Sequence, residues 1–365
     1  MRAPLPLFAG IFLLGCPSDY EVIPEPPDVA PGEVTDCGFT RIEGTDFYGY
    51  DCNPVFTSSG EDWAGAIGNT TFNVTEVLGH PFYQLWYVGA PNAQVMGDYG
   101  LGYAISDNGT NWIANPQNPL LESPPQPAAW NYSGMQGMQI VWDPAARQYL
   151  LLYGGYNVDT SQWMLGVATS PDGVAWTQSP SNPVFDLLQP QGGVLGWCWP
   201  LGLSLGSVGG YKGYVAGYDT FDGACAIYSL SSADGLTWHM DTDEVLPVGP
   251  NNSWYDQGFI STATTRLEDT WYMFFVGFGD WENHGTYKSS KNMFLGWATS
   301  PVLGAWQVQP ERIPIHQTAE GEIGSVAAHR VGSRIHIWVT DNWDGVNGVG
   351  YFLYDPLATA GDTAE

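Results

Sequence analysis

Three carboxylates are the first candidates for chemistry in this chain: Asp62, Asp256 and Glu322. Two carboxylates suffice to cleave a glycosidic bond, because one protonates the leaving oxygen and the other activates water or attacks directly. Each of the three stands shortly before a run that we expect to form an inner strand, so all three would meet if those strands surround one axis. Taken one at a time, such acids are more often solvated loop residues that cap turns.

Other side chains at the same strand starts and in neighbouring loops could contact a sugar. Sugar rings have apolar faces that stack on indoles and polar edges that hydrogen-bond to amides and carboxylates. For the tryptophans of this set, packing between elements is an equal alternative. The predicted substrate contacts are Trp63, Trp130, Gln136, Trp197, Trp199, Asp219, Trp254, Asp280, Glu282 and Trp343.

A repeated motif predicts the elements that would position these residues. It contains Ser, then Asp or Asn followed by Gly, then Trp, and it occupies residues 106–112, 170–176 and 232–238, with a looser copy at 300–306. The copies recur roughly every 65 residues, which indicates repeated supersecondary units. Asn-Gly and Asp-Gly steps favour hairpin turns, and we expect Trp112, Trp176, Trp238 and Trp306 to pack between units.

Each unit reads as about four antiparallel strands. Aromatic runs that end in glycine, such as Tyr83–Gly89, predict buried strands. A fifth unit near 334–354 lacks the turn motif, and residues 53–56 match the edge strand that it is missing. We therefore expect an all-β, five-bladed β-propeller of four-stranded blades, closed by the N-terminal segment. An open array of β-sandwiches is the less regular alternative.

The two ends of the chain predict its organisation and location. Residues 1–16 have a basic start, a short apolar run and a Leu-Leu-Gly-Cys sequence that resembles a bacterial lipobox. We expect Cys16 to carry a lipid anchor, which places the protein in the bacterial cell envelope, at the outer membrane or cell surface. An ordinary secretory signal is the alternative. Residues 17–36 predict a disordered acidic tether, 37–356 the propeller and 357–365 a disordered tail.

Four cysteines remain after Cys16, and they allow three pairings in an oxidising compartment. The local choice pairs Cys37 with Cys52 and Cys198 with Cys225. A metal role is disfavoured, because no Cys-x-x-Cys spacing occurs and the histidines do not cluster near the cysteines.

Charge limits the possible partners. Ten basic residues against 38 acidic ones give a net charge of −28, which argues against binding nucleic acid or anionic lipid headgroups. A solvated acidic surface explains this excess better than cation binding, because the acids are scattered. We expect a monomer without a cofactor or metal. A bound structural or catalytic calcium ion is the alternative.

The repeats resemble the five-bladed propellers of glycoside hydrolase families 43, 32 and 68 and the related phosphorylase family 130. The resemblance rests on the aromatic strands, the Gly-x-Ala-x-Ser-x-Asp-Gly-x-x-Trp turn and the Asn-Pro edges such as Asn182-Pro183, and it covers residues from about 53 to 355. It implies a carbohydrate partner and acid/base hydrolysis by carboxylates around a central funnel. Sialidase propellers fit less well, because Gly directly follows Asp172 and Asp234, one residue short of the sialidase motif.

The resemblance also implies one carboxylate on the first strand of each of the first three blades, and this chain departs from that pattern. Ala64 follows Trp63 in the first blade, and neither 130–136 nor 196–200 contains an acid. Three functions therefore stay open. They are a glycosidase with a relocated acid/base set, a carbohydrate-binding propeller without catalysis, and a platform that binds other proteins.

Overall fold

The structure is a computed structural model. It describes residues 37–357 apart from 59–62, 78, 92–99, 123–128, 132–134, 158–161, 187–195, 206–209, 219–223, 284–287, 316–322 and 344–345. Only the backbone is described at 156–157, 162–163, 186, 196–201, 204–205, 218, 242–244, 281–283 and 288–291. The predicted signal, Cys16, the tether and nearly all of the tail lie outside the described residues. No helix in the described part is long and apolar enough to cross a membrane.

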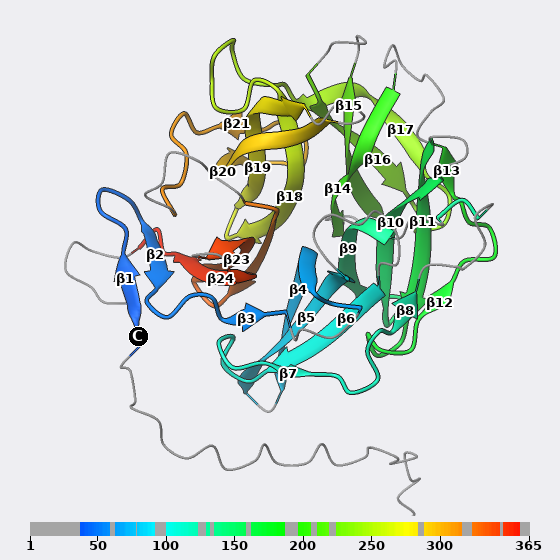
Figure 1. The fold of residues 1–365 in the computed structure, drawn as a ribbon, viewed down its shortest axis with the longest axis horizontal. Helices are drawn as coiled ribbons and strands as arrows, with labels where there is room; N and C mark the ends of the chain where they lie inside the picture. Colours follow the sequence, from blue (N-terminus) through cyan, green and yellow to red (C-terminus); the bar gives the residue numbers. More distant parts are fainter. Residues whose placement is uncertain are drawn as a thin grey trace, which may run out of the picture. The chain divides into compact units, whose positions relative to one another are not determined.

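The described residues form five antiparallel sheets, or blades, in chain order (Figure 1). Blade 1 contains β4 (Ala66–Val77), β5 (His80–Ala90), β6 (Gly100–Ser106), β7 (Ile113–Ala114) and β8 (Leu121–Glu122). Blade 2 contains β9 (Met135–Asp143), β10 (Gln148–Asn157), β11 (Gln162–Ser170), β12 (Thr177–Gln178) and β13 (Phe185–Asp186). Blade 3 contains β14 (Gly196–Leu205), β15 (Tyr211–Tyr218), β16 (Ala226–Ser232) and β17 (His239–Leu246). Blade 4 contains β18 (Gly258–Leu267), β19 (Thr270–Asn283), β20 (Lys288–Ser300) and β21 (Gln307–Val308). Blade 5 contains β22 (Ser325–Val331), β23 (Arg334–Trp343) and β24 (Val346–Tyr354), with β1 (Phe39–Arg41), β2 (Phe47–Tyr50) and β3 (Phe56–Thr57).

The five sheets close into a ring. Each inner strand contacts the next, in the cyclic order β4, β9, β14, β18, β22 and back to β4. Five separate hydrophobic cores follow the same order, and each core lies between two successive blades. Because every blade buries both faces against its neighbours, the apolar strands need no second layer. The predicted five-bladed propeller is confirmed.

Side chains of neighbouring blades satisfy amides of the inner strands. Thr70 N donates to Ser325 Oγ (3.2 Å), Gly137 N to Asn69 Oδ1 (3.0 Å) and Val326 N to Ser261 Oγ (3.1 Å). A buried N–H without a partner destabilises a fold, so these bonds hold successive blades together. They also join the early parts of β4, β9, β18 and β22, so these inner strands begin at one end of the axis.

The outer edges contain a second repeated device. In blade 1 the outer strand is split into β7 and β8, which both pair with β6. Asn118 fills the gap between them, because its Oδ1 accepts Tyr103 N (3.0 Å) and its Nδ2 donates to Tyr103 O (3.0 Å). Asn182 and Asn53 make the same two bonds to Val167 and Tyr351. The side-chain amide thus replaces one ladder residue beside a proline, which has no N–H to donate.

The repeated turns also match their prediction. Ser170 Oγ accepts Gly173 N (2.8 Å), and Asp172 Oδ1 accepts the N–H groups of Val174 and Ala175. The same bonds recur at Ser106 and Asn108 and at Ser232 and Asp234. Four tryptophans that follow the turns each pack against the core of one blade interface: Trp112, Trp176, Trp238 and Trp306.

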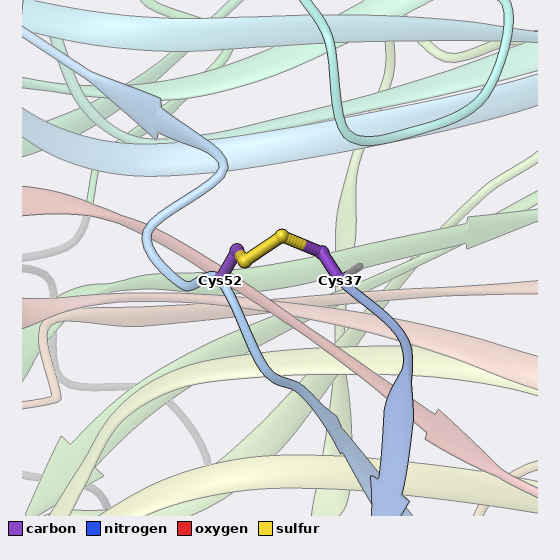
Figure 2. Close-up of a disulfide and its surroundings, with 2 residues drawn as sticks. All are labelled: Cys37 and Cys52. Atoms are coloured by element: carbon purple, nitrogen blue, oxygen red, sulfur yellow. A yellow bond between two sulfur atoms is a disulfide. The ribbon is translucent and has the colours of Figure 1, made fainter. Parts of the chain in front are cut away.

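The N-terminal segment completes blade 5. Strands β2 and β3 both pair with β24, and Val55 N donates to Val349 O (2.8 Å). The expected closure by residues 53–56 is therefore confirmed, with the β1–β2 hairpin as an addition. The predicted Cys37–Cys52 disulfide fastens the open end of that hairpin (Figure 2). Cys225 is disulfide-bonded as well, and its predicted partner Cys198 has a side chain outside the described ones.

Candidate functional site

The candidate site lies where the inner strands begin. We call this region the rim and define it as the residues that precede or begin β4, β9, β14, β18 and β22, together with those at the end of β23 and the start of β24 beside them. The hydrogen bonds from Gly137 N to Asn69 Oδ1 and from Thr70 N to Ser325 Oγ bring the starts of β4, β9 and β22 together. Since the strands share one direction, residues far apart in the sequence meet here.

Asp256 is the one predicted catalytic acid whose surroundings the structure describes. Its Oδ2 accepts Asn252 N (2.6 Å) and its Oδ1 accepts Gln257 Nε2 (3.2 Å). Both oxygens thus serve the turn that leads into β18, as a capping carboxylate does. Asp62 and Glu322 lie outside the described residues, so the proposed acid/base set stays a prediction.

Four rim tryptophans pack on glycines of their own blades. An added Cβ would lie 2.4 Å from the Trp63 ring at Gly89, from Trp130 at Gly155 and from the Trp254 ring at Gly296. Trp343 lies even closer to Gly350 and donates its indole N–H to Gly348 O. Packing therefore covers one face of each ring, and sugar contact by the remaining surface stays a prediction.

An aromatic ring of the same blade supports each of these indoles. Trp63 stacks on Tyr87 with ring centroids 5.8 Å apart, and Trp254 stacks on Phe275 at the same separation. Trp130 lies 5.5 Å from Tyr153. The Trp–Gly–aromatic grouping is thus a repeated feature of the blades.

The other predicted substrate contacts are placed only in part. Gln136 lies half-buried near the start of β9, and Asp280 is exposed on β19 opposite Lys291. The backbones of Trp197 and Trp199 begin β14, and that of Glu282 ends β19. The side chains of these three residues, and all of Asp219, lie outside the described part.

Further polar side chains, which are not among the predicted site residues, gather at the rim. Asn347 Oδ1 accepts Ile67 N (2.6 Å), and Ser325 Oγ lies 2.7 Å from Thr340 Oγ1. Asn131 is buried, and the buried carboxylate of Asp341 accepts Asn342 N (2.6 Å). The sequence signal that could have identified these residues is a polar side chain within an apolar strand, such as Thr340 in β23.

The acids of the repeated turns belong to the scaffold. Hydrogen bonds from Thr237 N and Leu236 N lower the pKa of Asp234 to about 2. Burial raises the pKa of Asp172, but bonds from Ala175 N, Val174 N and Ser170 outweigh it and the pKa falls. A carboxyl held ionised in this way is a poor general acid near neutral pH. The described residues contain no group of three or more His, Cys, Asp or Glu side chains that could hold a metal.

Comparison with known proteins agrees with this architecture. Neither a protein-family model nor a curated protein sequence matches the chain. Solved structures do match. A β-1,2-mannobiose phosphorylase from Listeria innocua, solved with β-1,2-mannobiose, has a TM-score of 0.60 and 13% identity over 85% of this chain and 96% of its own. A glycosyl hydrolase from Bacteroides ovatus has a TM-score of 0.57 and 15% identity over 90% and 97%. A thermostable family-43 glycoside hydrolase has a TM-score of 0.55 and 15% identity over 82% and 96%.

The chain has the fold of the five-bladed glycosidase propellers. The resemblance inferred from the repeats is thereby confirmed for the fold. At these identities the likeness extends to the backbone of the propeller and not to individual residues of its site.

Proposed function

We propose that this propeller binds a glycan at its rim. The observation that carries the proposal is the polar character of that region, where amides and hydroxyls such as Asn69, Asn131 and Ser325 lie at or near the starts of the inner strands. Such groups hydrogen-bond sugar hydroxyls, and the free face of an indole covers the apolar face of a sugar ring. The fold adds support, because a propeller of this architecture holds β-1,2-mannobiose in the Listeria phosphorylase.

Hydrolysis is the second candidate, and it would use Asp62, Asp256 and Glu322. The fold favours it, since similar structures include a family-43 glycoside hydrolase. The surroundings of Asp256 favour binding alone, because the N–H of Asn252 and the amide of Gln257 already occupy its carboxylate. We therefore place binding before turnover.

A panel of plant and microbial oligosaccharides would separate the two functions. We expect binding by calorimetry in the micromolar to millimolar range, and Gln136→Ala at the rim should weaken it about tenfold. Turnover that is lost in Asp256→Asn or Glu322→Gln would establish a glycosidase instead. If the protein neither binds nor cleaves any glycan, a protein-binding platform becomes the better description.

We propose further that a lipid at Cys16 tethers the propeller to the bacterial envelope, with residues 17–36 as the spacer. The Leu-Leu-Gly-Cys sequence supports this location. Cys16→Ser should move the protein from the membrane fraction to the soluble fraction of the envelope. Retention of the variant in the membrane fraction would refute the anchor without affecting the proposed binding of glycans.

A further inference from the structure

A cavity of about 450 Å³ lies at the end of the axis opposite the rim. Its walls come from the later parts of the inner strands, including 71–75 of β4, 139–142 of β9, 263–266 of β18 and 327–329 of β22. Because these strands begin at the rim, the cavity and the rim are separate sites. The exposed side chain of Arg266 marks its opening to solvent.

The charge of the cavity differs from that of the whole chain. The protein carries 38 acidic residues against 10 basic ones, yet no Asp or Glu is among the described residues that line this cavity. The ionisable groups among its described lining residues are Arg266 and His329. Burial lowers the pKa of His329 to about 4, so Arg266 supplies the positive charge at neutral pH. Arg266 thus provides one cation that can bind one carboxylate of a ligand.

Arg266 is available to a ligand. Its present partner is Asp269, at 3.2 Å, and the side chains of the two are 44% and 103% exposed. An ion pair this exposed contributes little stability, so a ligand carboxylate could replace that of Asp269. Arginine presents two parallel donors that match the two oxygens of a carboxylate.

The remaining walls have the mixture of surfaces that a sugar requires. Trp142 and Trp271 are partly exposed indoles, and the guanidinium of Arg266 lies 6.0 Å from the Trp271 ring centroid. Gln139 and several threonines also line the cavity, whereas Asn73 Nδ2 already donates to Gln84 Oε1 (2.9 Å). These polar side chains and Arg266 interrupt the apolar walls, whereas a lipid chain would need a continuous apolar surface.

We propose that this cavity binds a short acidic saccharide. In this arrangement Arg266 holds the carboxylate of the sugar, and Trp142 or Trp271 covers one face of a ring. The site is independent of glycan binding at the rim and needs no catalytic group. Its volume falls within the range of known small-molecule sites.

The test is calorimetry of the mature protein with digalacturonate and with the neutral disaccharide galactobiose. We expect a dissociation constant of about 0.1–1 mM for digalacturonate, at least tenfold weaker binding of galactobiose, and weaker digalacturonate binding at high salt. Arg266→Gln should reduce the affinity for digalacturonate about tenfold. Arg41→Gln is the matched control, because Arg41 also pairs with an aspartate, Asp46, but lies in β1 and does not line the cavity.

Two further results locate the bound sugar. Digalacturonate should shift the indole N–H signals of Trp142 and Trp271, each assigned by its Trp→Phe variant. The rim variant Gln136→Ala should leave the binding unchanged. Absence of binding, equal affinity for both disaccharides, or full binding by Arg266→Gln would each overturn the proposal. Binding that is lost in Gln136→Ala but kept in Arg266→Gln would place the sugar at the rim, in support of the proposed function alone.

Discussion

At the scale of single residues, three asparagines act as pieces of backbone. Asn53, Asn118 and Asn182 each precede a proline and each bind both the N–H and the C=O of one third-strand residue. The carboxamide has the donor and the acceptor of a peptide group, so it continues the ladder where the outer strand is interrupted. These asparagines therefore stabilise the propeller and do not belong to a site.

Asn182→Ala tests this role. The change removes the partner of Val167 N, which is buried within its sheet, so we expect the free energy of unfolding to fall by about 1–3 kcal/mol. Urea denaturation measures the loss. Asn111→Ala, at an exposed turn position, should cost less than about 0.5 kcal/mol. Equal effects of the two changes would contradict the assignment.

Two histidines at the junction of blades 5 and 1 predict sensitivity to acid. Burial lowers the pKa of His336 to about 3 and that of His329 to about 4, from 6.5. Tyr351 OH is bonded to His336 Nδ1. Because the unfolded chain takes up these protons near pH 6.5, stability is full above that pH and is lost as the pH falls toward 4 and 3.

The expected loss for His329 alone is about 1–2 kcal/mol between pH 7 and pH 5. Denaturation curves of His329→Gln should therefore show a shallower dependence on pH than those of the unaltered protein. His80→Gln provides the control, because His80 is exposed. An unchanged slope in His329→Gln would show that this histidine has the same pKa in the folded and unfolded states.

At the scale of elements, glycines with a positive φ in two of the turns lie in different packing environments. Gly173 has a φ of +83° and Gly304 one of +118°, a region that other residues rarely adopt. An added Cβ at Gly173 would lie 2.6 Å from Trp86, whose indole N–H donates to Gly173 O (2.7 Å). At Gly304 no atom lies within 4 Å of the added carbon.

The pair Gly173→Ala and Gly304→Ala separates backbone conformation from packing. We expect Gly304→Ala to lower the stability by about 1–2 kcal/mol, through the unfavourable φ alone. Gly173→Ala should lose about 3 kcal/mol or more, because it also displaces a fully buried indole. Thermal unfolding of both variants measures the difference. A larger loss at Gly304 would refute this account of the Gly173 turn, which belongs to blade 2 and packs against Trp86 of blade 1.

At the scale of the whole molecule, stability depends on closing the ring. The core between blades 5 and 1 combines residues from β2, β4, β23 and β24, so N- and C-terminal parts of the chain share one interface. A ring without free blade faces buries every sheet on both sides. The disulfide next to β1 therefore fastens the segment that completes the circle.

Cys37→Ser with Cys52→Ser should loosen this closure. The disulfide joins residues 15 positions apart, for which loop entropy predicts about 3 kcal/mol of stabilisation. We expect a lower midpoint in urea for the double variant, with an unchanged fold by circular dichroism. An unaltered midpoint would show that strand pairing alone holds β1 and β2 in place.

Much of this architecture could be predicted from the repeats. The spacing of the turn motifs required repeated units, and the match between Asn53-Pro54 and Asn182-Pro183 identified the closing segment. The β1–β2 hairpin escaped prediction because Phe39–Tyr50 has no counterpart in the other repeats. The side-chain caps on the inner strands escaped it as well, because Asn69 and Ser325 each accept an N–H from a neighbouring blade.

The sequence by itself determined the class of fold, the number of blades and the excess of negative charge, because these properties follow from local patterns and composition. Only the tertiary structure decided the roles of individual side chains. From the sequence alone, Trp63 and Trp254 could equally stack on a sugar or pack within the fold. Their glycine partners lie on separate strands that folding brings together. The cavity at the far end of the axis also depends on the tertiary structure, since strands of five blades contribute its described walls. Such sites depend on contacts between distant segments, which no local pattern encodes.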